Sequence, residues 1–254
     1  AVGYLALNTN TTGHSNVAVG ANALDTNATG NNNIAVGYLA LDKTTEDDNT
    51  AVGAYALREN TTGEYGTAVG AFALTKNTTA DGNSAFGWKA LNSNTTGDYG
   101  TAVGYLALEE CTTGVRNTAV GAQALREVTT ADNNTAAGFN ALLNTTTGLQ
   151  NTGIGCSALA ANTASNNNAF GYLALNANTT GASNCAFGSH ALEYNTTAAN
   201  NSAFGHRSLD ANTTGDSNSA FGMGTLGANT TGGKNTAIGY KALTANTTAS
   251  SNTA

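Results

Sequence analysis

Apolar and polar positions recur along this chain with a period of 17 residues. A glycine marks each repeat, an apolar residue precedes it, and a leucine follows it four positions later in every repeat. The spacing falls to 16 residues twice, from Gly37 to Gly53 and from Gly155 to Gly171. The fifteen marker glycines are Gly3, Gly20, Gly37, Gly53, Gly70, Gly87, Gly104, Gly121, Gly138, Gly155, Gly171, Gly188, Gly205, Gly222 and Gly239. A fixed period of this kind is typical of repeat architectures, in which one unit is stacked many times.

Each repeat contains three kinds of segment. The first, Thr-Ala-Val-Gly at residues 67–70 and its equivalents, is β-branched and bounded by Asn and Gly, which predicts a short strand. The second, Ala-Leu, is too short for periodicity to separate a second short strand from a single helical turn. The third, commonly Asn-Thr-Thr-Gly, predicts a turn, because Asn and Gly tolerate left-handed backbone angles and threonine hydroxyls bond nearby backbone.

Seventeen residues cannot bury a core alone, whereas stacked repeats can. We therefore predict an all-β fold, a parallel β-solenoid (β-roll) of about fifteen 17-residue coils, with a short helical turn in each coil as an open alternative. Equivalent residues of successive coils would form ladders. The ladder positions are represented by Ala68, Val69, Gly70, Leu74, Phe204, Gly205 and Leu209. Asparagines at one turn position would form a further ladder, in which each side-chain amide bonds the next coil.

The repeat runs through the whole chain, so we predict a single continuous array over residues 1–254. Coils about 4.8 Å apart would build a rod of roughly 70 Å. The chain begins and ends inside a repeat, and we expect it to be a segment of a longer protein.

The strand segment predicts one inward and one outward face. Side chains alternate along a strand, which places Ala on one face and Thr with Val or Phe on the other. An exposed strip of Val and Phe along the array would be a long apolar patch for a soluble monomer. We infer that one face fills the roll and the other meets a partner chain. A wider roll that holds both sets inside is the alternative.

Composition narrows the classes of partner. Only 10% of the residues are charged, the net charge is −7, and proline is absent, which fits a backbone whose N–H groups are used in hydrogen-bonded ladders. The nine Lys and Arg residues are scattered, so nucleic-acid binding is not expected. No apolar run reaches the about 18 residues that a membrane-spanning helix needs.

The unit Asn-Thr-Ala-Val-Gly-Tyr-x-Ala-Leu-x-x-Asn-Thr-Thr-Gly resembles the YadA-like head repeats of trimeric autotransporter adhesins and related repeats of phage tail-fibre-like proteins. The Ala-Val-Gly or Ala-Phe-Gly core carries the match, as in residues 67–70 and 202–205, and the match covers the whole chain. The resemblance implies a left-handed β-roll, three chains side by side, extracellular display, and adhesion to host or matrix molecules.

Candidate catalytic and metal-binding residues form no recognisable pattern. The three histidines, His14, His190 and His206, do not supply the three or four converging ligands that a metal site needs. We interpret the acidic run at residues 46–48 as a solvated turn. The three cysteines occupy different repeat positions, so a disulfide framework is not expected. They are Cys111, Cys156 and Cys185. We expect no enzymatic activity, no cofactor and no metal.

Asn-x-Thr sequons recur seven residues after the marker glycine. They are Asn10, Asn27, Asn60, Asn77, Asn94, Asn178, Asn195, Asn212, Asn229 and Asn246. Turn chemistry alone explains Asn-Thr-Thr-Gly, but in a secreted protein these asparagines are candidates for N-glycosylation. The adjacent threonines also suggest ice binding as a function, although only one threonine of each pair can face outward in an extended segment.

The function predicted from these patterns is that of an extracellular structural or adhesive fibre protein, an adhesin shaft or head or a self-assembling filament subunit, displayed at a cell or virion surface. Self-association as a homotrimer or filament is expected, and a host-surface, matrix or glycan ligand would be bound through repeated weak contacts. The alternatives are a ligand-binding solenoid, with ice or glycan as its ligand, and a phage tail-fibre segment.

Overall fold

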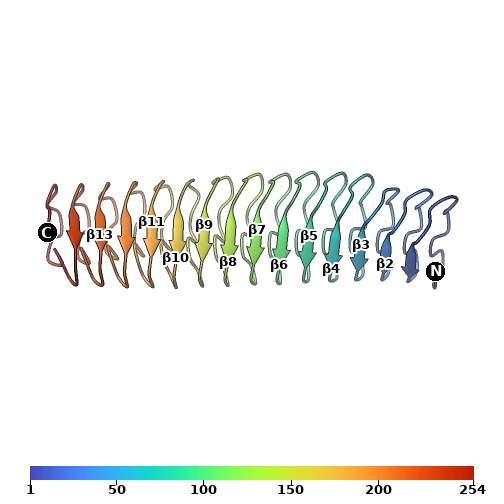
Figure 1. Ribbon diagram of the computed structural model, residues 1–254, viewed down its shortest axis with the longest axis horizontal. Helices are drawn as coiled ribbons and strands as arrows, with labels where there is room; N and C mark the ends of the chain where they lie inside the picture. The colour runs from blue at the N-terminus through green and yellow to red at the C-terminus, as the bar shows by residue number, and fades with distance from the viewer. The chain divides into compact units, whose positions relative to one another are not determined.

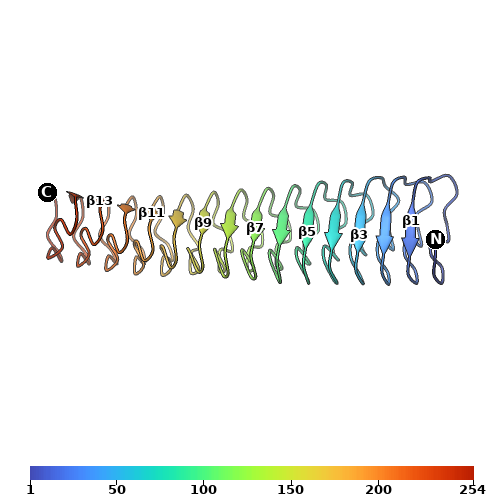
Figure 2. The same cartoon turned by 60° about the horizontal axis from the view of Figure 1, so that its bottom comes forward.

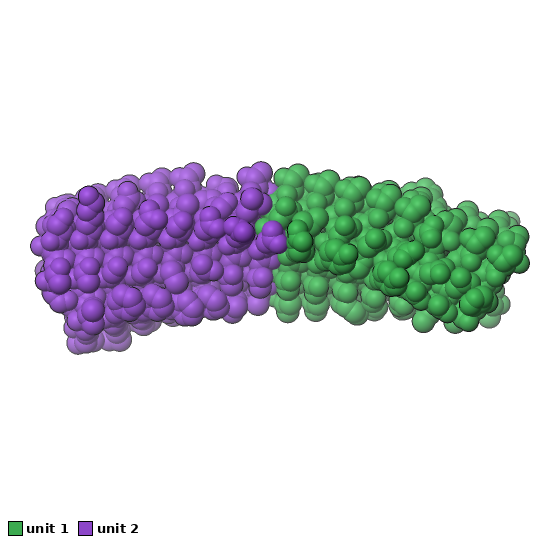
Figure 3. Space-filling view, turned by 45° about the horizontal axis from the view of Figure 1, so that its top comes forward, with its two compact units in different colours: residues 1–132 green, residues 133–254 purple.

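The computed structural model describes residues 1–254 as two units, residues 1–132 (unit 1) and residues 133–254 (unit 2), which are coloured separately in Figure 3. Each unit is a parallel β-solenoid in which every coil contributes one three-residue strand, and the chain contains no helix (Figure 1). The strands of unit 1 are β1 (Val17–Val19), β2 (Ile34–Val36), β3 (Thr50–Val52), β4 (Thr67–Val69), β5 (Ser84–Phe86), β6 (Thr101–Val103) and β7 (Thr118–Val120). The strands of unit 2 are β8 (Thr135–Ala137), β9 (Thr152–Ile154), β10 (Asn168–Phe170), β11 (Cys185–Phe187), β12 (Ser202–Phe204), β13 (Ser219–Phe221) and β14 (Thr236–Ile238).

Within each unit, every strand pairs in parallel with the next strand along the chain, so the strands stand in sequence order (Figure 2). Equivalent repeat positions are aligned: Ala68 of β4 lies opposite Ala85 of β5, and Val69 lies opposite Phe86. The predicted solenoid, its coil length and its in-register ladders are therefore confirmed.

Coil-to-coil hydrogen bonds continue beyond the strands. The Tyr55 amide donates to the Tyr38 carbonyl of the preceding coil at 2.9 Å, and the Leu57 amide donates to the Ala73 carbonyl of the following coil at 3.0 Å. Because these bonds run to the preceding and to the following coil, each coil is held by its two neighbours, as expected for a solenoid.

The interior of each coil is narrow and filled by small side chains around one leucine. In the coil that contains β4, Ala68, Ala73 and Leu74 are all completely buried. Two coils replace the second alanine with Ser208 and Thr225, and these buried hydroxyls donate to the carbonyls of Ala220 (3.2 Å) and Gly239 (2.7 Å). The predicted Ala and Leu ladders are thus the core.

The Ala-Leu segment is neither the short strand nor the helical turn that the sequence suggested. The Ala56 amide donates to the Gly53 carbonyl at 3.3 Å and closes a four-residue turn whose third residue, Tyr55, has φ of 62°. Leu57 follows with φ of 50° and is completely buried. Left-handed backbone is the geometry of a type II turn at this place. The sequence does not predict this turn, because leucine and tyrosine rarely adopt left-handed backbone angles. Such angles cost these residues roughly 1–2 kcal/mol each.

The marker glycine is required for close stacking. Gly70 has φ of 137°, and a Cβ at this position would lie 2.5 Å from the carbonyl oxygen of Gly87 in the next coil. Gly239 has a similar φ of 126°, but a Cβ there would meet nothing within 4 Å. The comparison shows that the neighbouring coil, as well as the backbone angle, excludes a side chain at Gly70.

Asparagine side chains form the predicted ladder inside the turn. Nδ2 of Asn77 donates to Oδ1 of Asn60 at 2.8 Å, and Nδ2 of Asn94 donates to Oδ1 of Asn77 at 3.0 Å. Each of these amides also donates to a carbonyl of its own turn, as Asn77 does to Ala80 at 3.0 Å. We call this row the amide ladder. Unit 2 continues the same pattern with bonds of 2.8–3.0 Å among Asn178, Asn195, Asn212 and Asn229.

A second row of asparagines lies four residues before the marker glycine. Oδ1 of Asn184 accepts a hydrogen bond from the backbone N–H of Asn201 in the next coil at 3.0 Å, while its Nδ2 donates to the Ala198 carbonyl at 2.8 Å. These asparagines are buried. Their full use of donor and acceptor groups makes a polar interior compatible with burial.

Candidate interaction surfaces

The outward side of the strands carries an uncharged apolar row, which we call the outward strip. It consists of the residue immediately before each marker glycine. In unit 1 these side chains stay partly exposed, with 36% of Val52, 36% of Val69 and 39% of Val103 accessible to solvent. The alanines between them point inward, so the wider roll that would hold both sets is excluded. Threonine or serine stands two residues earlier on the same face in β3 to β7.

In unit 2 the outward strip becomes a stack of phenylalanine rings. Phe170 and Phe187 have centroids 4.2 Å apart, Phe187 and Phe204 are 5.3 Å apart, and Phe204 and Phe221 are 4.9 Å apart, with planes within 16° of parallel. Each ring covers its neighbour, but one side of the row stays open to solvent, and 39% of Phe187 and 41% of Phe221 are exposed. The predicted Phe204 ladder is therefore present and faces outward.

Aromatic side chains flank the strip of unit 1 just after the marker glycine. Tyr55 stacks on Phe72 with centroids 5.0 Å apart, and Trp88 stacks on Tyr105 at 5.1 Å. The Lys89 ammonium lies 4.7 Å from the centroid of the Trp88 ring. Tyr55, Phe72 and Tyr105 flank valines of the strip, whereas Trp88 flanks Phe86.

The Asn-Thr-Thr-Gly turns form a different, polar edge. The first threonine donates its hydroxyl to the next coil, as Thr78 does to the Thr95 carbonyl at 3.0 Å. The second threonine is exposed in every coil that has one. We call this exposed row the threonine ladder; in unit 1 it includes Thr62, Thr79, Thr96, Thr113 and Thr130. The expectation that only one threonine of each pair faces outward holds for Thr78 and Thr79 but not for Thr61 and Thr62, which are both exposed, because the segment is a turn and not an extended strand.

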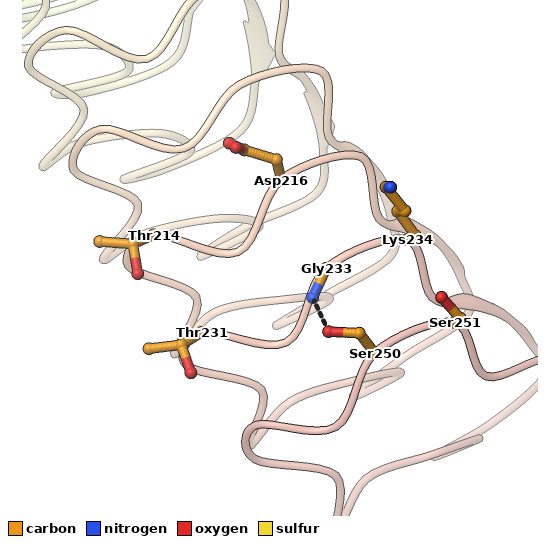
Figure 4. Close-up of a pocket in the computed structure, with 7 residues that line it drawn as sticks. All are labelled: Thr214, Asp216, Thr231, Gly233, Lys234, Ser250 and Ser251. Atoms are coloured by element: carbon orange, nitrogen blue, oxygen red, sulfur yellow. Dashed lines mark hydrogen bonds between the residues drawn. The ribbon is translucent and has the colours of Figure 1, made fainter.

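A shallow polar hollow opens beside the threonine ladder of unit 2 (Figure 4). Thr214 and Thr231 stand on one side, and Gly233 leaves room in the middle, where its N–H donates to the Ser250 hydroxyl at 3.0 Å. The hollow is lined by Thr214, Asp216, Thr231, Gly233, Lys234, Ser250 and Ser251. It offers hydroxyl groups, one carboxylate and one ammonium, but no aromatic side chain.

The equivalent edge of unit 1 is acidic and aromatic. Oδ1 of Asp81 accepts from the Glu64 amide, and Oδ1 of Asp98 accepts from the Asp81 amide, both at 2.9 Å. The next residue along the chain after Glu64 and Asp98 is a tyrosine, and Tyr65 and Tyr99 are exposed. The Glu64 carboxylate beside it raises the pKa of the Tyr65 phenol. Sequence analysis did not single out these tyrosines, because they are two coils apart and only the stacking register relates them.

Eight of the ten predicted glycosylation sites are buried in the folded protein. The side chains of Asn27, Asn60, Asn77, Asn94, Asn178, Asn195, Asn212 and Asn229 are at most 1% exposed. Their Nδ2 atoms, to which a glycan would be attached, donate hydrogen bonds within the turn, as that of Asn60 does to the Gly63 carbonyl at 2.8 Å. Asn10 and Asn246 are only partly buried. The sequon pattern is therefore explained by the amide ladder, and glycosylation at the buried positions is incompatible with this fold.

The titratable residues considered for chemistry do not converge. His190 contacts Glu193 through Nδ1 at 2.7 Å and His206 ring to ring at 6.1 Å, so the fold brings together two histidines that the repeat numbering separates. No three His, Cys, Asp or Glu side chains are grouped so that they could hold a metal ion. The cysteines are free thiols, and burial raises the pKa of Cys111 to about 11.

Comparison with known proteins finds no protein-family model, no curated protein and no solved structure that matches the chain. A helix capable of crossing a lipid bilayer is absent from the structure. The outward strip and the turn edge are the two exposed surfaces that recur from coil to coil.

Proposed function

We propose that this chain is a segment of an extracellular adhesive fibre in which copies of the chain associate side by side through their outward strips. The observation that carries the proposal is the exposure of the strip, where the successive coils of β3 to β7 place Val or Phe at 36–44% exposure with no charged residue on the same strand face. A continuous apolar row of this kind is a typical interaction surface. Three chains, as in the adhesins that the repeat resembles, would bury the strips around one axis.

The turn edges supply the adhesive part of the proposal. They lie away from the strand face, they are exposed, and they repeat once per coil. Many weak contacts to a cell surface or matrix would then add, because the second and later contacts are made at a high effective concentration. Display at a cell or virion surface is the setting in which such an edge is useful.

Light scattering on the purified chain tests the self-association. We expect a molar mass that is a multiple of the chain mass, and we expect the triple variant Val52→Thr, Val69→Thr and Val103→Thr to shift the mass towards that of one chain. Threonine keeps the β-branched shape and removes apolar surface. The matched control is Thr62→Ser, Thr79→Ser and Thr96→Ser on the turn edge. A wild-type chain that remains a monomer at its solubility limit would contradict the proposal.

Thiol cross-linking provides a second measurement. Cys185 lies at the start of β11 on the outward face, two residues before Phe187. In a Cys156→Ser variant it is the accessible thiol, because Cys111 is buried. Parallel chains in register bring copies of Cys185 together, so a short bis-maleimide reagent should give covalent multimers. Failure to cross-link in a sample that scatters as a multimer would exclude the strip as the interface.

The threonine ladder favours ice binding as a second candidate function. Its hydroxyl and methyl groups recur once per coil on an exposed edge, at a spacing of about 4.8 Å. Thermal hysteresis of the purified chain, compared with that of a Thr79→Tyr and Thr96→Tyr variant, decides between the candidates. Hysteresis that the variant loses would favour ice binding.

A further inference from the structure

We propose that the acidic turn edge of unit 1, from Thr62 to Tyr99, binds an extended neutral polysaccharide, with Tyr65 and Tyr99 as stacking platforms. The inference deepens the adhesive function proposed above, on which its biological setting rests, by naming a ligand class. Binding itself is a property of one chain and is independent of self-association.

The two tyrosines have the spacing of an extended glycan. They occupy the same repeat position two coils apart, and 59% of Tyr65 and 62% of Tyr99 are exposed. Coils about 4.8 Å apart place these positions about 9.6 Å from each other. In an extended β-1,4-linked glucan, alternate sugars present the same face at nearly this repeat. Exposed aromatic rings with an apolar body and a polar tip are suited to such faces.

Gly82 keeps the surface between the tyrosines low. A Cβ at Gly82 would lie 2.8 Å from Cδ1 and 3.0 Å from Cε1 of Tyr99, so the tyrosine ring rests against this glycine. Contact with the backbone limits the positions that the ring can take. The remainder of the ring is open to solvent, and the residue at the equivalent position of the coil between the two platforms, Gly82, has no side chain.

Hydrogen-bonding groups accompany the platforms. The residue before Tyr65 is Glu64, and Asp81 and Asp98 continue the same row. One oxygen of each aspartate is held by a backbone N–H at 2.9 Å, which orients the carboxylate and leaves its second oxygen to accept from sugar hydroxyls. The hydroxyls of Thr62, Thr79 and Thr96 lie exposed a few residues earlier in the same turns and make no hydrogen bond to the protein.

Charge selects the class of glycan. The carboxylates of Glu64, Asp81 and Asp98 form a negative row, and Asp47 extends it by one coil. Uronate or sulfate groups placed over this row would be repelled, whereas neutral sugars can donate to it. Unit 2 lacks the platforms and should not bind, because none of the residues at the equivalent positions is aromatic; they are Asn133, Gln150, Asn166, Ser183, Asn200, Ser217, Lys234 and Ser251.

Isothermal titration of the whole chain with cellohexaose tests the proposal, with alginate as the anionic comparison. We expect binding of cellohexaose and none of alginate. The double variant Tyr65→Ala and Tyr99→Ala should weaken binding about tenfold or more, because two aromatic contacts are lost. Tyr65→Phe with Tyr99→Phe should keep most of the affinity. The control is Tyr194→Ala, an equally exposed tyrosine of unit 2, which should bind as the wild type does.

A glycine pair provides a test that leaves both tyrosines in place. Gly82 and Gly224 have nearly the same φ, 65° and 63°, so alanine strains both backbones equally. At Gly82 the new methyl group displaces the Tyr99 ring, whereas at Gly224 it meets only Cγ of Lys241 at 3.4 Å. Gly82→Ala should therefore weaken cellohexaose binding and Gly224→Ala should not.

Three results would overturn the proposal: no heat of binding with the wild-type chain, equal affinity in the Tyr65→Ala and Tyr99→Ala variant, or equal affinity for alginate. Light scattering on the same samples keeps the proposals separate. A monomer that binds cellohexaose refutes the side-by-side fibre alone, and a multimer that does not bind refutes the glycan site alone.

Discussion

Nδ2 of Asn77 donates to Oδ1 of Asn60 at 2.8 Å, and both side chains are buried. The amide ladder is therefore satisfied only as a row, because each asparagine supplies the donor for the acceptor of the coil before it. Asn94 shows what happens where the row stops. The next coil has Cys111 at this position, and Oδ1 of Asn94 is buried without a partner.

Replacing Asn77 by valine should destabilise the protein by about 1–3 kcal/mol, because Oδ1 of Asn60 would be buried without a donor. The free energy of unfolding from urea titration measures the effect. Cys111→Val is the matched control at the same repeat position, where Oδ1 of Asn94 already lacks a partner. Equal losses in the two variants would show that the amide hydrogen bonds contribute nothing net.

Gly70→Ala should lower the free energy of unfolding by more than about 4 kcal/mol, a loss typical of severe steric conflicts. The new Cβ would lie 2.5 Å from the Gly87 carbonyl oxygen. Gly239→Ala adopts a similar backbone angle with no neighbour within 4 Å, so it should lose only the roughly 1–3 kcal/mol of backbone strain. Thermal unfolding followed by circular dichroism compares them. The steric argument fails if the two variants melt alike.

Thiol reactivity should separate the cysteines. Cys156 is exposed, whereas burial raises the pKa of Cys111 to about 11, so Cys111 is both shielded and protonated at neutral pH. Treatment of the folded chain with iodoacetamide at pH 8, followed by peptide mass spectrometry, should find Cys156 alkylated and Cys111 intact. Urea should make all three thiols react. Rapid native labelling of Cys111 would mean that its coil opens readily.

Asp42→Asn should stabilise the protein at pH 7 by up to about 1 kcal/mol, because partial burial and a like charge in the neighbouring coil both disfavour an ionised carboxylate. Burial raises the pKa of Asp42, and the negative charge of Asp25 in the preceding coil raises it further. The folded state therefore favours the protonated acid, and ionisation of Asp42 lowers stability at every pH above its raised pKa. The advantage of Asp42→Asn should vanish as the pH falls below the ordinary value of 3.8, which urea titrations across that range would reveal.

The stacking register could be predicted from sequence because the same few residues return at a fixed spacing. The positions of Ala68 and Leu74 carry a small or apolar residue in every coil, and only the stacking of coils can bury such a row. The inward and outward faces of the strand followed from the two-residue alternation of side chains. These inferences need only the period and the chemistry of the repeated positions.

The path of the chain between strands could not be predicted. Leu57 is buried in a left-handed conformation that its own chemistry disfavours, and the cooperation of neighbouring coils stabilises it there. The burial of eight of the ten sequon asparagines could not be predicted for a related reason, since asparagine is usually exposed and only the paired amides of successive coils make its burial favourable. Tyr65 and Tyr99 become one surface only after the coil between them is placed.

The direction of the amide ladder has a consequence for how such chains change in length. Every asparagine of the row offers a donor backwards and an acceptor forwards, so a duplicated or deleted block of 17 residues rejoins donor to acceptor without a mismatch. The two 16-residue repeats show that a change of one residue is also absorbed within the polar part of a coil, since the strands on either side stay in register. Related genes are therefore free to gain or lose whole coils, and with them adhesive turns, while the chemistry at each junction stays the same.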